Sequence, residues 1–477
     1  MPSYQLEISV TEKCNLGCPY CYVANVDKFM TPEIFDKAWP EFLQLIQRSK
    51  AHGQQFHLSF FGGEPLLNVP LMDHVCKKVK VPEYEDRLVG LTMISNLSLI
   101  NEETADWILD NQIGVSWSFD GISANESRPI IKNFGENKGY NNVLEMYSDR
   151  QHLIKKVTKH NKTCKIMIFP GNVDSMTENF EFLVDFGIPA PDFSIVRDDI
   201  WSLDDIHKFR VECRRLADRT IQYYDEGKLI SNGMFNLPLQ DMLLGLTKQK
   251  RAFGCFAGHH GSIMAVDGTF YPCARFGSKK LLPMKGDEYN FDYFQSVFNP
   301  LAFDKCKGCR LYKVCNAGCT YSQLRNGNQP IDSVCELFHI YYDEAIRMVE
   351  ICKDMPTFQT YIKTLWGGRT GFYEPNADKE EVDMFEMIDE AWQKNEKYKR
   401  LTNFKIKTED YDDTIEQQLN LMYSAIKKLN DIDKALVFLY LEDKSYREIS
   451  ETLGITEVNA RVKMNRAKEK LRKILNP

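Results

Sequence analysis

The sequence predicts an α/β protein in which a parallel barrel is followed by a cysteine-rich extension and an all-α C-terminal domain. Three observations predict this organisation. Strand-like and helical segments alternate from residue 6 to residue 196, ten of the fourteen cysteines fall in two groups, and the chain becomes strongly helical after residue 415. At roughly 150 residues per domain, a chain of 477 residues is long enough for about three domains.

The composition is that of an ordinary globular protein, with 43% hydrophobic and 27% charged residues. This balance excludes a disordered, collagen-like or coiled-coil chain. Sixty basic against sixty-seven acidic residues give a net charge of −7, so the chain as a whole is not a binder of polyanions. No run approaches the ~18 apolar residues of a membrane span. The first residues lack the basic and apolar regions of a signal peptide. We therefore expect a cytoplasmic protein with no membrane partner.

The barrel is predicted from six strand-like segments with helical patterns between them. Two examples of such helical patterns are residues 33–47 and residues 177–186. Repeated βα units build a parallel sheet or barrel whose chemistry lies at the carboxyl ends of the strands. The strands are predicted at residues 6–10, 58–61, 90–94, 114–119, 165–169 and 192–196.

Cys14, Cys18 and Cys21 form a C-x3-C-x2-C loop after the first strand. Disulfides are rare in a reducing compartment, so clustered cysteines there indicate metal or redox chemistry. Three thiolates can hold three irons of a [4Fe–4S] cubane and leave the fourth iron free to chelate a small molecule. Zinc is the alternative, but structural zinc takes four ligands, and no nearby His or Cys completes the set. The loop therefore favours an iron–sulfur cluster.

A second group of seven cysteines occupies the segment that follows the barrel. Seven thiolates are more than one site needs, although two sites of four ligands would need eight. The group comprises Cys255, Cys273, Cys306, Cys309, Cys315, Cys319 and Cys335. The four remaining cysteines occur singly in apolar or helical contexts, which predicts buried small side chains. They are Cys76, Cys164, Cys213 and Cys352.

Four short motifs follow one another at the predicted strand ends. They are CNLGCPYCY at residues 14–22, GGEP at 62–65, SN at 95–96, and SWSFDG at 116–121 with Arg128 after it. Together with the seven-cysteine pattern, they make residues 4–340 resemble a radical S-adenosylmethionine (SAM) enzyme with a SPASM extension, as found in peptide maturases and anaerobic sulfatase maturases. The resemblance implies a partial (β/α)6 TIM-like barrel over residues 1–235 and a SPASM domain over residues 236–370.

The resemblance also implies a SAM site. A [4Fe–4S] cluster on Cys14, Cys18 and Cys21 would bind SAM, and the residues at the strand ends would line the pocket. GGEP would hold the SAM amino group, SN the ribose, and Arg128 the carboxylate, although a structural ion pair is the alternative role for Arg128. The pocket residues are Gly62, Gly63, Glu64, Ser95, Asn96, Ser118, Asp120 and Arg128. In this family, cleavage of SAM by one electron gives a 5′-deoxyadenosyl radical, which here implies a reducing donor of the flavodoxin or ferredoxin type.

By the same analogy, the seven SPASM cysteines divide between two auxiliary [4Fe–4S] clusters. Cys306, Cys309, Cys315 and Cys335 would ligate the outer cluster. Cys255, Cys273 and Cys319 would ligate the inner one. His259 and His260 are candidates for a fourth ligand of the inner cluster, but a structural role or an open iron is the alternative.

One departure from the sulfatase maturases concerns the reaction. Those enzymes carry an acidic residue directly after the cysteine that corresponds to Cys273, whereas this chain has Ala274. Asp198 or Asp199 could replace that acid, and no catalytic residue is assigned. The departure favours cross-linking or oxidation of a residue in a peptide or protein substrate over formylglycine formation. An iron–sulfur sensor that regulates transcription is a further alternative, but a sensor needs no SAM motifs.

The C-terminal third divides into an acidic linker at residues 371–414 and a helical domain at residues 415–477. Residues 374–416 contain fourteen Asp and Glu against seven Lys and Arg. In the helical domain, a short helix, a turn at Gly454 and a helix opened by Thr456 form a helix-turn-helix pattern. The last helix is basic, and we expect Val458, Val462 and Leu471 to form its apolar seam.

Residues 416–475 resemble region 4 of an extracytoplasmic-function sigma factor, the module that reads the −35 element of promoters. Region 2 of such factors is not recognisable in this chain. The resemblance implies contact with DNA or RNA polymerase through residues 415–477, and docking of a protein is the alternative.

Overall fold

The computed structural model divides the chain into two compact units, Met1–Ala391 and Trp392–Pro477. The structure describes residues 3–49, 51–159, 163–186, 188, 190–236, 238–239, 255, 257–285, 289, 303–312, 315, 318–367, 426, 429–441, 444, 446–456, 459–460, 462–464, 466–467 and 470–471. The linker predicted at residues 371–414 lies outside the described residues.

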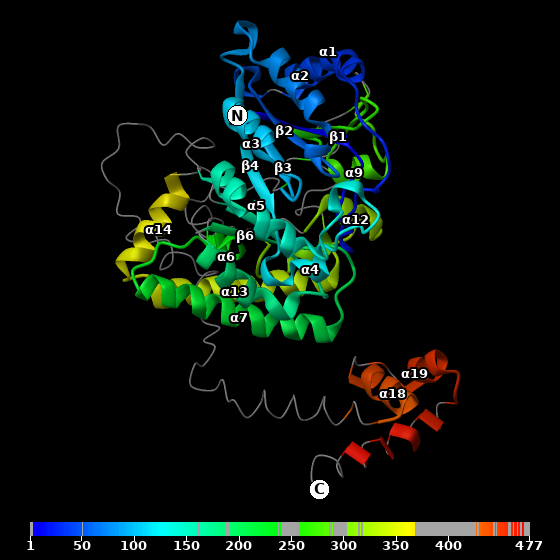
Figure 1. Ribbon diagram of the computed structural model, residues 1–477. Coiled ribbons are helices and arrows are strands. Elements are labelled where there is room, and N and C mark those ends of the chain that lie inside the picture. The colour runs from blue at the N-terminus through cyan, green and yellow to red at the C-terminus, as the bar shows by residue number, and fades with distance from the viewer. Residues whose placement is uncertain are drawn as a thin grey trace. The chain divides into compact units, whose positions relative to one another are not determined.

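The first unit is built on one curved sheet of eight strands in the order β6-β5-β4-β3-β2-β1-β7-β8 (Figure 1). Pairing is parallel from β6 to β7 and antiparallel between β7 and β8. The strands are β1 (Tyr4–Thr11), β2 (Phe56–Gly62), β3 (Leu88–Ser95), β4 (Gly114–Ser118), β5 (Thr163–Ile168), β6 (Ala190–Ile195), β7 (Gly261–Met264) and β8 (Phe270–Tyr271). The six predicted strands are confirmed as β1 to β6, side by side in chain order.

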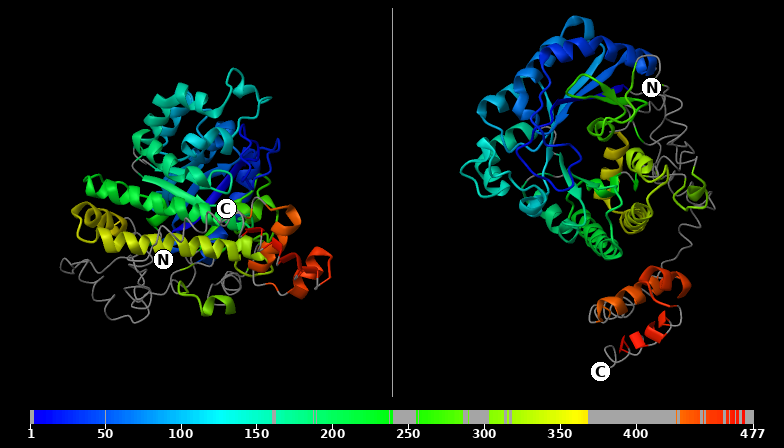
Figure 2. Two further views of the ribbon diagram at one scale, coloured as in Figure 1. Left: turned by 90° about the horizontal axis from the view of Figure 1, so that it is seen from below. Right: turned by 90° about the vertical axis from the view of Figure 1, so that its right-hand side faces the viewer.

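Helices cover the outer side of this sheet, as the right-hand view of Figure 2 shows. Those of the barrel are α1 (Pro32–Ser49), α2 (Val69–Val79), α3 (Glu102–Asp110), α4 (Ala124–Ser127), α5 (Val143–Thr158), α6 (Met176–Phe186) and α7 (Leu203–Asp225). The face of α1 that packs on the sheet carries Phe35, Trp39, Phe42 and Ile46, at the spacing of three to four residues that a buried helix face requires. The predicted α/β class is confirmed.

The strands separate two environments. Phe56, Leu58 and Phe60 of β2 are buried, while the residues between them are partly exposed. The partly exposed positions of the other strands carry mostly polar residues, among them Glu7, Thr92, Ser116 and Lys165. The sheet therefore presents one apolar face to the helices and a more polar face on its inner side.

The cysteine-rich segment adds the β7–β8 hairpin to the β1 edge of the sheet, which the sequence did not predict. The helices of this segment are α9 (Ala274–Ser278), α11 (Asp304–Lys307), α12 (Thr320–Arg325), α13 (Asp332–Cys352) and α14 (Pro356–Gly367). The long helix α13 packs along α7 (Figure 1). The four single cysteines, Cys76, Cys164, Cys213 and Cys352, are all buried, as predicted.

The second unit has an apolar core of its own, formed around α18 (Asp431–Leu441) and α19 (Tyr446–Leu453). Gly454 follows α19 with φ +63°, a conformation that glycine adopts without strain at the end of a helix. The Thr456 hydroxyl accepts a hydrogen bond from the Asn459 backbone N–H at 3.2 Å, so Thr456 caps the next helix as predicted. The buried core residues are Ile426, Leu429, Leu436, Val437, Ile449, Ala460, Met464 and Ala467.

The predicted apolar seam of the last helix is wrong at Val462, whose exposed fraction is 42%. The buried face instead passes through Ala460, Met464 and Ala467, with Leu471 partly buried beside them. This spacing of three or four residues follows the helical period, and Val462 falls on the opposite side. Val458 lies outside the described residues. Of the helices that the structure describes, none is long and apolar enough to cross a membrane.

Candidate active site at the carboxyl ends of the strands

The backbone of the loop that carries the first three cysteines is held in place by hydrogen bonds from Asn25 and from the segment around residue 130. Asn25 bonds both backbone groups of Cys14: its Oδ1 accepts from the N–H and its Nδ2 donates to the carbonyl, each at 2.9 Å. The Gly17 N–H donates to the carbonyl of Pro129 at 2.8 Å, and the Ile131 N–H donates to the carbonyl of Asn15 at 3.0 Å. Sequence reasoning missed Asn25, which stands four residues after the last cysteine of the loop.

The three thiols lie close enough to influence one another electrostatically. Burial raises the pKa of Cys14, as do the Glu64 carboxylate and the other two thiols. Burial also raises the pKa of Cys18, to about 11, although Arg128 acts in the opposite direction. The Leu16 N–H faces the Cys14 sulfur at 3.4 Å. Among the described residues, no three His, Cys, Asp or Glu side chains are arranged as ligands of one metal ion. Thiols supported by backbone N–H groups are the donor set that iron–sulfur clusters use.

Gly62 and Gly63 bring the end of β2 against the start of the cysteine loop. A Cβ on Gly62 would lie 2.1 Å from the Thr11 carbonyl oxygen, and a Cβ on Gly63 would lie 2.1 Å from that of Lys13. Gly62 also has φ +138°, which side chains rarely allow. The Gly63 and Glu64 N–H groups donate to these same two carbonyls, at 2.7 and 2.8 Å. At both glycines, therefore, the backbone at the start of the cysteine loop lies in the space that a side chain would fill.

Glu64, Ser95 and Asn96 form one buried hydrogen-bonded unit. The Glu64 carboxylate accepts from the Ser95 hydroxyl at 2.6 Å and from the Asn96 N–H at 2.8 Å. Burial raises the pKa of Glu64 to about 7, and these hydrogen bonds oppose the rise. The Asn96 side chain donates to Asn15 Oδ1 at 3.1 Å and lies 3.8 Å from the Cys14 sulfur. The structure thus joins three of the predicted pocket residues to the cysteine loop.

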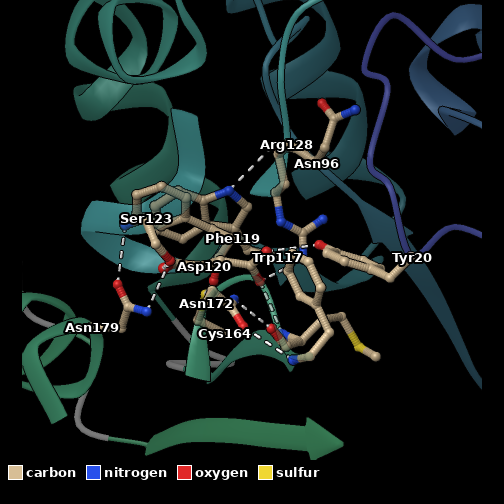
Figure 3. A network of polar contacts seen from close by, with 12 residues as sticks. Tyr20, Asn96, Trp117, Phe119, Asp120, Ser123, Arg128, Cys164, Asn172 and Asn179 are labelled. Atoms are coloured by element: carbon tan, nitrogen blue, oxygen red, sulfur yellow. Dashed lines mark hydrogen bonds and ion pairs between the residues drawn. The ribbon is translucent and has the colours of Figure 1, made fainter. Parts of the chain in front are cut away.

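Asp120 and Arg128 form a buried ion pair, 2.9 Å apart, which Tyr20 of the cysteine loop joins (Figure 3). Asp120 also accepts from the Tyr20 hydroxyl at 2.7 Å and from the Met167 N–H at 2.9 Å. Burial disfavours the charged form of Arg128, but Asp120, Tyr20 and Cys18 raise its pKa well above the usual range. Removing one partner of such a pair typically costs ~3–5 kcal/mol of stability. Arg128 therefore forms the ion pair that was the alternative expectation, and its contact with the SAM carboxylate stays a prediction.

Two further features bear on a ligand at this site. Arg128 Nε is buried and has no hydrogen-bond partner in the described structure, so this N–H is available to a ligand. Its guanidinium carbon lies 5.6 Å from the ring centroid of Tyr20, a residue that sequence reasoning missed although it lies between Cys18 and Cys21. Ser118 ends β4 on the partly exposed face, opposite Lys165 of β5. The cradle of donors and acidic groups around the thiols fits a cluster with a zwitterionic ligand.

The inner cysteines, Cys255, Cys273 and Cys319, are brought together beside the first loop. Cys273 directly precedes α9 and Cys319 directly precedes α12. All three pack on an apolar cluster that also contacts Tyr22, the residue after Cys21. Burial opposes ionisation of the Cys319 thiol, but Arg275, hydrogen bonds from Ser322 and the charge of Arg197 together outweigh it, so the pKa of Cys319 lies below its usual value.

Three of the four outer cysteines lie near one another, Cys306 on α11, Cys309 just after it and Cys335 on α13. Cys306, Cys309 and Cys335 interact electrostatically, and the Leu311 N–H faces the Cys309 sulfur at 3.4 Å. His339 Nε2 lies 3.3 Å from the same sulfur. Sequence reasoning missed His339, although it stands one helical turn after Cys335 on α13 and therefore shares its face.

The two candidate histidine ligands lie at the start of β7. The His260 carbonyl accepts a hydrogen bond from the Gln5 N–H at 2.7 Å, which joins β1 to this edge. Burial, followed by the neighbouring His259, lowers the pKa of His260 to about 4. His260 is therefore neutral at physiological pH, the form in which an imidazole can bind a metal.

Asp198 and Asp199, the acids expected to replace the one missing at Ala274, are both engaged with other side chains. Asp198 is engaged with Arg275 and accepts from the Ser322 hydroxyl at 3.0 Å. Asp199 accepts from the Ser333 hydroxyl at 3.4 Å. The carboxylate that reaches Ala274 is that of Glu7 on β1, which is hydrogen-bonded by the Ala274 backbone. Burial raises the pKa of Glu7 to about 7, and this hydrogen bond opposes the rise.

Comparisons with known proteins agree with this geometry. Residues 8–188 match the model of the radical SAM superfamily, and residues 419–471 match that of sigma-70 region 4. An uncharacterized protein of Methanocaldococcus jannaschii is 28% identical over 193 residues, which is 40% of this chain and 62% of that protein, less than two thirds of its length. A cysteine-type anaerobic sulfatase-maturating enzyme of Clostridium perfringens is 21% identical over 384 residues, which is 74% of this chain and all of that enzyme.

A solved structure, native anSMEcpe with bound AdoMet and Cp18Cys peptide, shares the fold with a TM-score of 0.56 and 18% identity, over 74% of this chain and 99% of that one. The radical SAM family implies a [4Fe–4S] cluster and SAM. The chain therefore joins a domain of the radical SAM superfamily to a C-terminal segment of the sigma-70 region 4 family.

Proposed function

We propose that this protein is a radical SAM enzyme that modifies a residue of a peptide or protein by cross-linking or oxidation. One observation carries the proposal. The three-cysteine loop, the Glu64–Ser95–Asn96 unit and the Asp120–Arg128 pair converge at the carboxyl ends of β1 to β4, where barrels of this kind hold their reactive groups.

Cys14, Cys18 and Cys21 would hold the [4Fe–4S] cluster beside SAM. The chemistry that the cluster and SAM supply when bound is hydrogen-atom abstraction by a 5′-deoxyadenosyl radical. The chain's own task is to bind and orient SAM. The buried and unpaired Nε of Arg128 suits the SAM carboxylate, and the buried acceptors of Glu64 and Asn96 suit the amino group and the ribose. A flavodoxin- or ferredoxin-type donor would supply the electron.

The downstream cysteines would hold two auxiliary [4Fe–4S] clusters, divided as the resemblance to SPASM enzymes implies. The inner set, Cys255, Cys273 and Cys319, packs on one apolar cluster, and the outer set lies around Cys309 and His339. Both sets combine thiols with N–H donors that face sulfur, which supports the assignment. His260 stays a candidate for the fourth position of the inner set.

A peptide substrate is supported by the relatives and by the inner face of the sheet. The solved anSMEcpe structure holds AdoMet and a peptide. In this chain the inner face carries partly exposed polar side chains, such as Ser59, Thr92 and Ser116, that can bond an extended backbone. Formylglycine formation is the second candidate. It is favoured by the full-length match to the maturases and disfavoured by Ala274.

The test uses mass spectrometry of peptides. We expect the reconstituted protein, given SAM and dithionite without oxygen, to remove two hydrogen atoms from a member of a library of short synthetic peptides. A cysteine-containing sulfatase peptide is the competing probe, and loss of its sulfur would show formylglycine formation instead. Conversion of SAM to 5′-deoxyadenosine while every peptide keeps its mass would contradict a peptide substrate.

For residues 415–477 we propose contact with DNA through the helix that Thr456 opens. Asn459 and Arg466 are exposed on this helix, on the side away from Ala460 and Met464. Contact with RNA polymerase is the alternative, and a regulatory role would add to the enzymatic one.

We expect the 477-residue chain to bind a labelled duplex that carries a −35-like element, with an affinity that falls steeply as salt rises. Arg466→Gln should weaken this binding, because it removes a cation from the exposed face. No binding at low salt, or equal binding by Arg466→Gln, would refute contact through this helix.

A further inference from the structure

Arg275 stands where the first cysteine loop meets the inner cysteines. It is the second residue of α9 and follows Cys273 by two positions. Its guanidinium carbon lies 5.4 Å from the ring centroid of Tyr22, which follows Cys21, and 5.0 Å from that of Tyr321. One cation therefore touches aromatic residues that belong to both cysteine groups.

The guanidinium is oriented by two fixed partners. Its Nη2 forms an ion pair with Asp198, and its Nη1 donates to the Ser322 hydroxyl at 3.0 Å. Ser322 in turn donates to Asp198 at 3.0 Å, which closes a ring of three side chains. The side chain of Arg275 is only 18% exposed, so this ring is largely shielded from water.

In this orientation Arg275 Nη1 also lies 3.6 Å from the Cys319 sulfur, within hydrogen-bond range for sulfur. A hydrogen bond from a cation to a thiolate is charge-assisted and stronger than a neutral one. Positive charge and hydrogen bonds at the sulfur ligands of an iron–sulfur cluster are among the factors that set its reduction potential. They stabilise the reduced cluster more than the oxidised one, because reduction adds negative charge.

We propose that Arg275 is a positioning residue that raises the reduction potential of the inner auxiliary cluster through its N–H···S hydrogen bond to Cys319. The inference rests on the proposed function, because it requires a cluster on Cys255, Cys273 and Cys319. Asp198 and Ser322 hold the guanidinium in place. A cluster of higher potential is the better electron acceptor, so this residue would favour electron transfer to the inner cluster.

The experiment is a redox titration followed by electron paramagnetic resonance. The full chain carries Cys14→Ala, Cys18→Ala and Cys21→Ala, so that only the downstream clusters give signals, and the signal lost with Cys273→Ala is assigned to the inner cluster. We expect Arg275→Gln to move the midpoint of that signal to more negative potential and to leave the outer signal unchanged. Arg275→Lys, which keeps the charge and loses the planar fork, should give a smaller shift.

The matched control is Arg325→Gln, which removes the same charge from an exposed position on α12. An unchanged midpoint in Arg275→Gln would overturn the proposal, and so would an equal shift in Arg325→Gln. If Arg275→Gln assembles no inner cluster, the midpoint of Arg275→Lys is measured instead, and an unchanged midpoint in that variant would overturn the proposal. Iron and sulfide for only one downstream cluster, with no signal that depends on Cys273, would instead refute the auxiliary-cluster assignment itself.

Discussion

Replacing Gly63 with alanine is expected to lower SAM cleavage by ~100-fold, the loss that a displacement of about 1 Å can produce in an active site. The added Cβ would lie 2.1 Å from the Lys13 carbonyl oxygen, 2.4 Å from the Lys13 carbonyl carbon and 3.0 Å from the Cys14 nitrogen. These are backbone atoms, so no side-chain rotation can relieve the clash. Either the end of β2 or the cysteine loop must move, and Cys14 moves with the loop.

This prediction is checked by measuring iron content and 5′-deoxyadenosine after anaerobic reconstitution. The matched control is Gly135→Ala, because no atom lies within 4 Å of a Cβ at that position. We expect Gly135→Ala to behave as the wild type. Full iron content and full cleavage in Gly63→Ala would mean that the cysteine loop is not held against β2 in the way the structure shows.

The barrel could be predicted from the sequence because its strands are regular. The alternation of Phe56, Leu58 and Phe60 with more polar residues marks β2 directly, and long amphipathic segments such as α1 follow the period of a helix. Parallel strands place all their carboxyl ends at one edge, so the sequence positions of GGEP and SN predicted that both motifs lie at that edge, where Glu64, Ser95 and Asn96 meet.

The β7–β8 hairpin could not be predicted in the same way. Its strands have four and two residues, and all four residues of β7 are buried, so no alternation is present. Its pairing with β1 joins Gln5 to Gly261, a contact between residues far apart in the chain. Only the folded sheet shows that the cysteine-rich segment completes the edge beside β1.

The site residues that were missed depend on contacts of the same long-range kind. Glu7 looks like an ordinary polar residue of a strand until the Ala274 backbone is placed beside it. Arg128 was expected to face a ligand with its charge, but Asp120 accepts from its Nη2, while the buried Nε has no partner among the described residues. Motif spacing identifies the residue types at a site, and the packing of distant segments decides how their hydrogen bonds are shared.

Cys14→Ala is the second substitution with a large expected effect. Cys14 is the cysteine most closely tied to the proposed SAM pocket, since its sulfur faces the side chain of Asn96 and its backbone is fixed by Asn25. Alanine removes one of three ligands, and a cluster held by two thiolates would not be retained beside SAM. The two proposed downstream clusters keep all their cysteine ligands in this variant, so most of the iron should stay bound.

The control for this variant is Cys76→Ala. Cys76 is buried on α2, outside both cysteine groups, so its replacement removes a thiol of the same size without touching a proposed ligand. We expect the iron content and the SAM cleavage of Cys76→Ala to equal those of the wild type. A loss in this variant as large as that in Cys14→Ala would mean that cleavage reports on folding and not on the first cysteine loop.

The most direct test of the account is the amount of 5′-deoxyadenosine that the reconstituted protein forms from SAM and dithionite without oxygen. We predict turnover in the wild type and in Cys76→Ala, and none in Cys14→Ala, although Cys14→Ala keeps its downstream iron. Cleavage by Cys14→Ala at the wild-type rate would contradict the assignment of the cluster to the loop of Cys14, Cys18 and Cys21.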